Sequence, residues 1–334
     1  MRKRSGLKNL QMRAVVVSCV CVATSFCVAQ NAGALASQGE YASGPNMDRD
    51  LLPTPMKRDD EKRADAAAPV ATEAEEESRL HFSAGIDFTN AYYYRGIRQE
   101  DRGFLAQPWA TLGIDIYKPE GFTLTPYIGT WNSFHDRATG AAQNDNLDDK
   151  WYESDIYFGA NAAFGKWTLG AQYGFFTSPS DAWTTIEELQ FMATYDESEW
   201  LGAWSMKPTV VLAFETSDGT ADGQDKGTYL QLGVTPGFNL GTREGGDALV
   251  RIDIPVTVGL SLSDYYQGSD GEDETFGYAS IGIKASYAIP LDDKWGSWTV
   301  YGSATGVLLG DSTQDFNDDE DTVGILSAGV SLSF

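Results

Sequence analysis

Cysteine is scarce in this chain. Its 334 residues include three cysteines, all between positions 19 and 27. Because this stretch belongs to a predicted signal peptide, the mature chain would have neither a disulfide framework nor a thiolate metal site. Glycine-rich phosphate loops, the H-E-x-x-H pattern and nucleophile elbows are also missing from the sequence, and we therefore predict no enzyme.

Long apolar runs are missing as well. The run AVVVSCVCVA (14–23) is too short to cross a bilayer as a helix, and no later stretch approaches the roughly 20 apolar residues required. Basic residues precede this run and an A-L-A cleavage pattern (34–36) follows it, which predicts a secretory signal peptide at 1–36. VVSC (16–19) loosely resembles a lipoprotein box, so lipidation is an alternative. Without a spanning helix, only a closed barrel can cross a membrane.

Positive charge is also in short supply. Lysine and arginine number 24 against 48 aspartates and glutamates, which gives a formal net charge of −24. Loss of the five positive charges in the signal would change −24 to −29. Such acidity argues against nucleic acid and anionic surfaces as partners, and it favours cations at any binding surface.

Residues 37–79 differ in composition from the rest of the chain. Proline, alanine and mixed charges dominate, without a sustained apolar period. Such a stretch cannot bury enough apolar surface to offset its ordering entropy. We predict a disordered acidic periplasmic tether, with a plug or a partner-binding segment as the alternative.

From Leu80 to the end of the chain, apolar and polar residues alternate. Alternation over about ten residues is typical of a membrane β-strand, with one face toward lipid and the other toward the lumen. The predicted fold is therefore all-β, a transmembrane antiparallel up-and-down β-barrel of about 12 strands over 80–334. The alternating segments lie near 80–94, 104–117, 122–132, 151–164, 167–176, 185–195, 206–215, 228–238, 248–262, 276–289, 297–309 and 322–334.

The connections between these segments alternate in character. Turn-like ones such as 118–121 and 239–247 alternate with loops such as 95–103 and 133–150. Periplasmic turns and extracellular loops show this asymmetry, which places both termini in the periplasm. Aromatic residues near strand ends predict girdles at the membrane interface, among them Tyr92, Tyr94, Trp167, Trp295 and Trp298.

The last segment, LSAGVSLSF (326–334), ends on an aromatic residue. Gly329, Leu332 and Phe334 resemble the G-x-x-Φ-x-Φ ending that the barrel assembly machinery recognises. In water the apolar face of such a strand is an aggregation hazard, whereas in a barrel the strand pairs with the first one. We therefore predict the outer membrane of a Gram-negative cell as the location. The expected partners are outer-membrane lipid, lipopolysaccharide and the assembly machinery.

Several motifs resemble those of a known family. YRGI (94–97) follows a run of tyrosines, and QP (107–108) begins an alternating strand. In these features the chain resembles the TorF-like family of proteobacterial outer-membrane proteins of unknown function. WYESDIYFGANAAFG (151–165) and GTYLQLGVTP (227–236) resemble later strands of the same family. The resemblance spans much of 82–240 and implies an outer-membrane barrel, without an established activity or catalytic residue.

Arg95 follows three tyrosines near the predicted mouth of the barrel. It could contact an anionic solute, or it could close the tight turn at Gly96 through a structural ion pair. Its candidate partners are Glu153, Asp155 and Glu188.

His81 and Ser83 lie on the same face of the first strand, as the histidine and serine of a lipid hydrolase would. The alternation places both toward the lumen at the periplasmic end, away from outer-leaflet lipid. We therefore expect ordinary lumenal residues and no catalysis.

Two predicted loops, 264–274 and 311–321, are acidic and contain no lysine or arginine. Their carboxylates offer the hard oxygen ligands that Ca²⁺ and Mg²⁺ prefer, but neither loop matches the EF-hand pattern. Solvated loop charge and loose divalent binding that bridges to lipopolysaccharide phosphates are the two interpretations, and no other cofactor is expected. The candidate ligands are Asp270, Glu272, Asp273, Asp315, Asp318, Asp319 and Asp321.

These features predict a narrow, porin-like small-solute channel with cation preference. The alternative is a non-conducting structural or surface-interaction barrel whose acidic loops bind divalent cations or a partner. A lipid-modifying enzyme and a soluble secreted β-protein are further alternatives. The residues predicted to line the lumen are Asp87, Asp115, Glu153, Asp155, Tyr157, Glu188, Gln190, Lys207, Arg251, Asp253 and Lys284.

Overall fold

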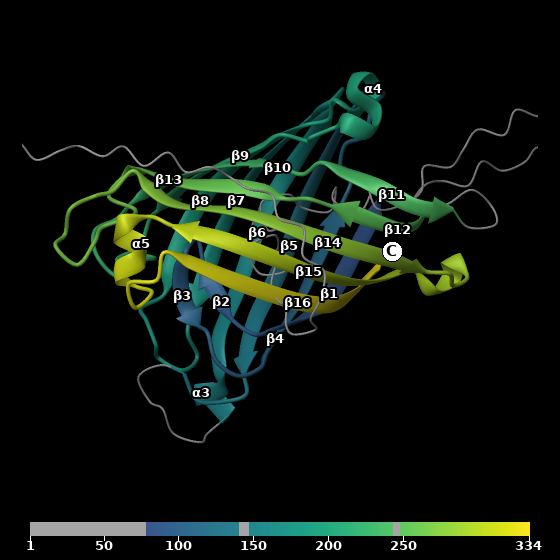
Figure 1. Ribbon diagram of the computed structural model, residues 1–334. Coiled ribbons are helices and arrows are strands. Elements are labelled where there is room, and N and C mark those ends of the chain that lie inside the picture. The colour runs from purple at the N-terminus through teal and green to yellow at the C-terminus, as the bar shows by residue number, and fades with distance from the viewer. Residues whose placement is uncertain (1–77, 140–146, 243–247) are drawn as a thin grey trace, which may run out of the picture.

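The computed structural model describes residues 78–139, 147–242 and 248–334, and these form a β-barrel (Figure 1). The predicted signal peptide and nearly all of the predicted tether lie outside the described residues. No helix within the described part of the chain is long and apolar enough to cross a membrane.

Twelve antiparallel strands form the wall of the barrel within the described residues, which confirms the predicted fold. Each strand pairs with the next one in the wall, and the last pairs with the first. The predicted segments agree with them to within a few residues, with two exceptions. The first predicted segment ends too late, and the one at 248–262 begins eight residues before the corresponding wall strand. The wall strands are β1 (Leu80–Thr89), β4 (Leu105–Ile114), β5 (Phe122–His135), β6 (Trp151–Phe164), β7 (Trp167–Thr177), β8 (Ile186–Tyr195), β9 (Thr209–Glu215), β10 (Thr228–Val234), β13 (Val256–Ser263), β14 (Phe276–Ile289), β15 (Ser297–Leu309) and β16 (Thr322–Ser333).

Two prolines interrupt neighbouring wall strands. β10 continues through Pro236 into β11 (Gly237–Thr242), and β12 (Ala248–Asp253) continues through Pro255 into β13. Proline lacks the N–H group that the ladder needs, so each long strand is divided at this residue. The turn was predicted at 239–247, but its first four residues belong to β11, so the predicted turn begins too early.

The pairing of β16 with β1 closes the barrel. The N–H of Phe334 donates to the carbonyl of Phe82 at 2.9 Å, and the reverse bond measures 3.2 Å. Their rings lie 6.5 Å apart between centroids. The terminal strand therefore has no open edge toward β1, while recognition of Gly329, Leu332 and Phe334 by the assembly machinery stays a prediction.

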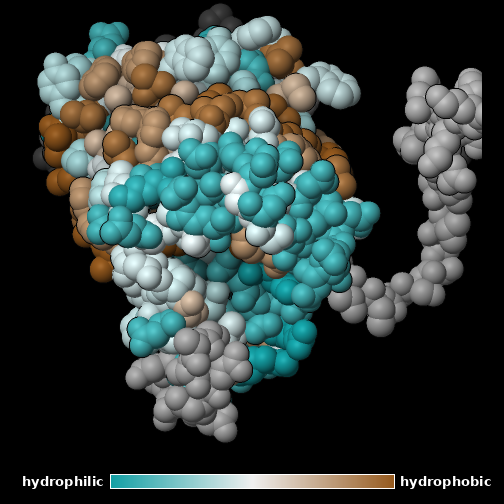
Figure 2. Space-filling model, turned by 90° about the vertical axis from the view of Figure 1, so that its left-hand side faces the viewer, coloured by the Kyte–Doolittle hydropathy of each residue, from teal (hydrophilic) through white to brown (hydrophobic). Residues whose placement is uncertain are grey.

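The two faces of the wall differ in polarity. Polar residues such as Gln107, Asn161 and Gln172 are buried on the inner face. Figure 2, which looks at the end carrying α5 (Asp311–Asp315), shows hydrophilic side chains over this end and hydrophobic ones around the side. This pattern is the one a lipid-facing barrel requires. Exposed apolar side chains on the outer face include Leu112, Ile128, Ile156, Phe158, Phe191, Leu232, Ile281 and Ile283.

Short helices mark the two ends of the barrel. The end named here the loop end carries α5 and α3 (Leu147–Lys150). The opposite end, named the turn end, carries α4 (Ser198–Leu201), η2 (Gly202–Trp204) and η3 (Asp293–Trp295), together with the C-terminus (Figure 1).

The first predicted strand and loop differ from the structure. β1 ends at Thr89, and the chain then forms a separate hairpin of β2 (Tyr92–Tyr94) and β3 (Ile97–Glu100). The two residues of its turn, Arg95 and Gly96, have φ angles of 48° and 88°. Positive φ at both central residues is characteristic of the tight hairpin turn that reverses the chain within two residues. The prediction of strand to 94 and open loop over 95–103 was therefore wrong.

A charge on the outer face tests the lipid-facing assignment. Ile283 lies in the middle of β14 and is 51% exposed. We expect Ile283→Lys to lower the free energy of unfolding by about 2–4 kcal/mol, because the ammonium group enters the hydrocarbon core. Leu291, 49% exposed in the turn after β14, is the matched control, where lysine costs about 0–1 kcal/mol. Denaturant unfolding from lipid vesicles measures both variants, and equal costs would contradict the assignment.

Candidate functional site

The β2–β3 hairpin occupies the lumen at the loop end. It forms a two-stranded sheet of its own and makes no ladder with the wall. Tyr92 and Tyr93 are 0% and 3% exposed, and Arg95 at the tip is 6% exposed. Tyr92 and Tyr94, predicted for an interfacial girdle, therefore lie inside the barrel instead, because the chain turns inward after Thr89.

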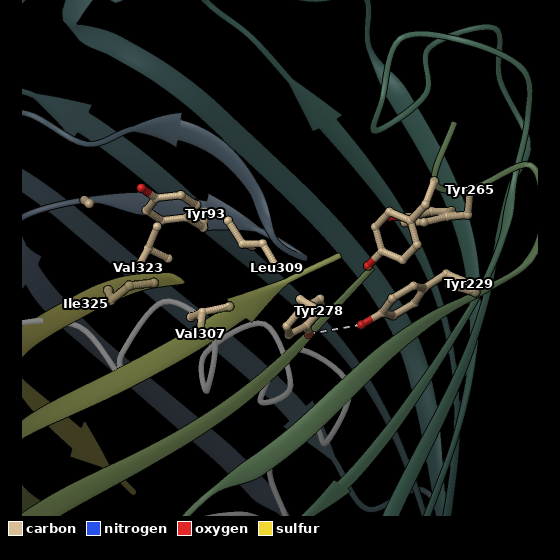
Figure 3. Close-up of a cluster of buried hydrophobic side chains, with 11 residues drawn as sticks. Tyr93, Tyr229, Tyr265, Tyr278, Val307, Leu309, Val323 and Ile325 are labelled. Carbon is tan, nitrogen blue, oxygen red and sulfur yellow. Dashed lines mark hydrogen bonds between the residues drawn. The ribbon is translucent and has the colours of Figure 1, made fainter. Parts of the chain in front are cut away.

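An apolar seat on the wall receives the second tyrosine of the hairpin. Tyr93 packs with four inward-facing residues of the last two wall strands, as Figure 3 shows. Residues that face the lumen of a barrel are usually polar. Packing of the hairpin against these four residues explains why they are apolar. The four residues, named here the apolar seat, are Val307, Leu309, Val323 and Ile325.

The first tyrosine packs against a different part of the wall, formed by β4, β5 and β6. The ring of Tyr92 lies 5.2 Å from that of Trp131, and the same buried cluster includes Leu105, Tyr127, Tyr152 and Tyr157. The hairpin is thus held by apolar contacts with two parts of the wall.

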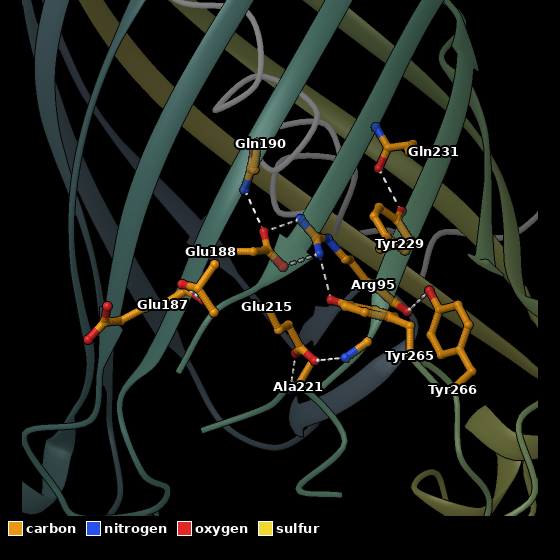
Figure 4. A network of polar contacts seen from close by, with 12 residues as sticks. Arg95, Glu187, Glu188, Gln190, Glu215, Ala221, Tyr229, Gln231, Tyr265 and Tyr266 are labelled. Atoms are coloured by element: carbon orange, nitrogen blue, oxygen red, sulfur yellow. Dashed lines mark hydrogen bonds and ion pairs between the residues drawn. The ribbon is translucent and has the colours of Figure 1, made fainter. Parts of the chain in front are cut away.

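The tip of the hairpin carries a buried ion pair (Figure 4). Nη1 and Nη2 of Arg95 donate to the two carboxylate oxygens of Glu188 at 2.6 and 2.8 Å. Nη1 also donates to the hydroxyl of Tyr265 at 2.6 Å, and the guanidinium lies 4.1 Å from the ring centroid of Tyr229. This is the planar, bidentate geometry that arginine provides and lysine does not. The predicted pairing of Arg95 with a lumenal carboxylate is present, and Glu188 is the partner.

Two loops hold the backbone of the hairpin turn. The hydroxyl of Tyr266 donates to the carbonyl of Arg95 at 2.9 Å, and Nδ2 of Asn317 donates to the carbonyl of Gly96 at 2.7 Å. Asn317 also accepts from the N–H of Arg98 at 3.1 Å. The loops β13–β14 and β15–β16 therefore fix the tip from the solvent side.

Glu153 and Asp155 form a second acidic feature. Both are buried on the inner face of β6, and Glu153 lies beside the hydroxyl of Tyr92. No ion pair joins either carboxylate to a basic residue within the described part of the chain, and Oδ1 of Asp155 accepts no hydrogen bond there. Glu153 and Asp155 were predicted as candidate partners of Arg95, but in the structure neither forms an ion pair with it.

Other predicted lumen residues pair along the wall. The hydroxyl of Tyr301 donates to Asp87 at 2.7 Å, and Nζ of Lys284 lies 4.4 Å from the same ring. Nε of Arg251 donates to Asp253 at 2.8 Å.

Tyr157 and Gln190 also lie inside the barrel. The hydroxyls of Tyr157 and Thr111 are 2.9 Å apart, and Gln190 donates to Glu188 at 2.7 Å. Lys207 is the exception among the predicted lumen residues. It precedes β9 in the connection at the turn end, where its N–H donates to Glu197 at 2.9 Å, because Pro208 delays the start of the strand.

His81 pairs with a carboxylate at the turn end. Its Nε2 lies 3.0 Å from Oδ1 of Asp115, which also accepts from Thr125 at 2.7 Å. Nζ of Lys118 lies 3.4 Å from the other carboxylate oxygen. The contacts of His81 are therefore those of a small charged cluster near the rim.

The acidic loop residues are distributed among separate local contacts. Asp315 accepts from the N–H of Ser269 at 2.8 Å, which lowers the pKa of its carboxyl. Asp270 accepts from the N–H of Glu272 at 3.0 Å, and Asp273 from Ser261 at 2.6 Å. Among the described residues, no group of three or more histidine, cysteine or acidic side chains is placed to hold a metal. Loose divalent binding stays a prediction, also for Asp319 and Asp321.

Sequence reasoning missed the residues that receive the hairpin. They include Tyr229, Tyr265, Tyr266, Asn317 and the apolar seat. A signal was present, because VLL (307–309) and VGIL (323–326) break the alternation by placing apolar residues on both faces of β15 and β16.

Comparisons with known proteins add little beyond the kind of fold. No family model matches the chain and no curated protein is similar in sequence, so the TorF-like resemblance stays a prediction. The outer membrane channel COG4313 from Pseudomonas putida F1 is similar in structure, with 11% identity, a TM-score of 0.47, and coverage of 80% of this chain and 100% of that one. The translocator domain of the autotransporter NalP from Neisseria meningitidis has 12% identity, a TM-score of 0.41, and coverage of 90% and 95%. Such weak likenesses carry no functional information.

Removing the carboxylate of Glu188 should release the hairpin. Glu188→Ala leaves the guanidinium of Arg95 buried without its partner, which costs about 3–5 kcal/mol. We expect faster hydrogen exchange of the amides in 90–104, measured by mass spectrometry. Glu187→Ala is the matched control, since the Glu187 carboxylate accepts from Tyr173 on the other face of β8. Unchanged exchange in Glu188→Ala would contradict the role of the ion pair.

The outer contact of the hairpin should depend on pH. Arg98 donates to Asp318 at 2.8 Å, and this bond lowers the pKa of the Asp318 carboxyl below its usual 3.8. A lowered folded-state pKa stabilises the docked hairpin above pH 3.8, and this stabilisation is lost as the pH falls through the folded value. Protection factors of the β3 amides should therefore decrease below pH 3.8. The decrease should be smaller in Asp318→Asn, and an identical decrease in that variant would contradict the assignment.

Proposed function

We propose that this protein is an outer-membrane channel for small solutes, with a preference for cations, and that the β2–β3 hairpin closes it in the present state. The observation that carries the proposal is that the hairpin lies inside the wall without being part of it. β1 and β4 pair directly with each other along the wall. Their ladder ends at the pair Thr89–Leu105, and these two residues flank the inserted segment that contains the hairpin. Withdrawal of the hairpin would therefore break no ladder of the wall.

The contacts that hold the hairpin are confined to the loop end of the barrel. They include the Arg95–Glu188 ion pair, bonds to Tyr266 and Asn317, and apolar packing around Tyr92 and Tyr93. On β3, Arg98, Gln99 and Glu100 add bonds to Asp318, Tyr152 and Thr139. Local opening of a segment with few contacts requires less free energy than unfolding of the whole domain. Such a segment can act as a gate.

The charge of the lumen supports a preference for cations. Glu153 and Asp155 are adjacent on the inner face, and neither has an ion pair within the described part of the chain. Buried carboxylates without a basic partner take up a proton, because their charged form is costly away from water. In a lumen opened to water they would ionise, and a passing cation would offset the repulsion between them. Carboxylates along a pore attract cations and exclude anions.

A non-conducting barrel is the second candidate. The apolar seat favours it, because Tyr93 is almost fully buried there among apolar side chains. In that case the acidic loops would serve surface interaction, for example with divalent cations that bridge to lipopolysaccharide.

Planar-bilayer recordings distinguish the two candidates. We expect the refolded protein to show rare conductance steps, because the docked hairpin blocks the lumen. Replacement of 91–103 by a short glycine–serine linker should give frequent and larger steps, with a reversal potential in a salt gradient that indicates cation selectivity.

The selectivity has its own control. Glu153→Gln combined with Asp155→Asn should weaken cation selectivity in the variant without the hairpin, whereas Glu187→Gln on the other face of β8 should not. If the variant without the hairpin folds, as judged by heat-modifiable mobility on a gel, and remains silent, the channel is rejected and the non-conducting barrel is favoured.

A further inference from the structure

The wall of the barrel contains a complete site for a guanidinium group, which Arg95 occupies. The carboxylate of Glu188 comes from β8, the ring of Tyr229 from β10 and the hydroxyl of Tyr265 from the β13–β14 loop. These three residues, named here the cation box, come from separate elements of the wall and its loops. The hairpin contributes the occupant, with Tyr94 as an additional ring 4.9 Å from the guanidinium.

Withdrawal of the hairpin would leave the carboxylate of Glu188 in the cation box without its cationic partner. Glu188 is fully buried, and apart from Arg95 only Gln190 donates to it within the described part of the chain. Glu215 lies directly opposite Glu188 in the ladder, and the N–H groups of Ala221 and Gly227 hold its carboxylate at 2.6 and 2.8 Å. Two carboxylates in a partly desolvated site repel each other and attract a replacement cation.

We propose that the cation box binds small organic cations that bear a guanidinium group, and that Arg95 is a built-in occupant which such a solute displaces. This inference rests on the proposed channel and names its substrate class. Displacement would free the tip of the hairpin, so binding of the solute and opening of the mouth would be coupled.

The geometry selects guanidinium over ammonium. Two N–H groups meet the two oxygens of Glu188, the hydroxyl of Tyr265 accepts a further bond, and the central carbon lies 4.1 Å from the ring centroid of Tyr229. A primary ammonium group is a compact charge that cannot form the fork and stack on the ring at once.

A variant that empties the cation box tests the inference without requiring conductance. In detergent, methylguanidinium should raise the thermal unfolding midpoint of Arg95→Ala, with an apparent affinity at least about tenfold higher than that of methylammonium. The shift should vanish in Arg95→Ala combined with Glu188→Gln. Arg98→Ala is the matched control, because this arginine pairs with Asp318 outside the cation box and Arg95 still fills the site.

The outcomes separate this inference from the proposed function. Equal effects of the two probes, or an equal shift without Glu188, would overturn the cation box even if the barrel conducts. Selective binding in a barrel that never conducts would support the cation box and reject the channel.

A folding control keeps the test decisive. If Arg95→Ala lacks heat-modifiable mobility, the wild-type protein replaces it. Methylguanidinium should then speed hydrogen exchange in 92–100 more than methylammonium does, through competition with Arg95. Equal exchange with the two probes would overturn the inference.

Discussion

Every peptide group in hydrocarbon needs a hydrogen-bond partner, and in this protein the pairing of β16 with β1 supplies the last set. A sheet closed in this way has one face toward lipid and one toward the lumen. The side-chain alternation then decides which residues meet which surroundings. Outer positions such as Ile156 and Ile283 meet lipid, and inner positions such as Gln107 and Asp155 are withdrawn from it.

The closed wall also explains why a separate element can lie inside it. The hairpin carries its own ladder, so its backbone needs few partners from the wall. Side-chain contacts hold it in place, with Tyr93 against the apolar seat, Tyr92 against Trp131, and the guanidinium of Arg95 against one buried glutamate. A buried ion pair of this kind adds little net stability, yet it is costly to break from one side. The main effect of the Arg95–Glu188 ion pair is therefore to fix the hairpin in one docked position, and its contribution to the stability of the fold is small.

The sequence predicts the wall well because the period of two is a property of each strand by itself. The strand number, the β1–β16 closure and the lumenal positions of Asp87, Glu153 and Glu188 all follow from it. The hairpin could not be predicted in the same way, because YYY (92–94) also continues the first strand by propensity. Its inward turn depends on tertiary contacts with Asn317 and Tyr266, which lie more than 170 positions away. Lys207 was misplaced because a proline, and not the alternation, sets where β9 begins.

The seam between the first and last strands has a kinetic consequence. The hydroxyl of Thr89 contacts the carbonyl of Leu326 across 237 positions of sequence. Contacts so distant in sequence form late, since the entropy of closing the loop between them must be met first. Until then β1 and β16 both expose unpaired edges, which are able to pair with other strands. We therefore expect this seam to be the last part of the wall to form during assembly, and its two open edges to be the most exposed to wrong pairing until then.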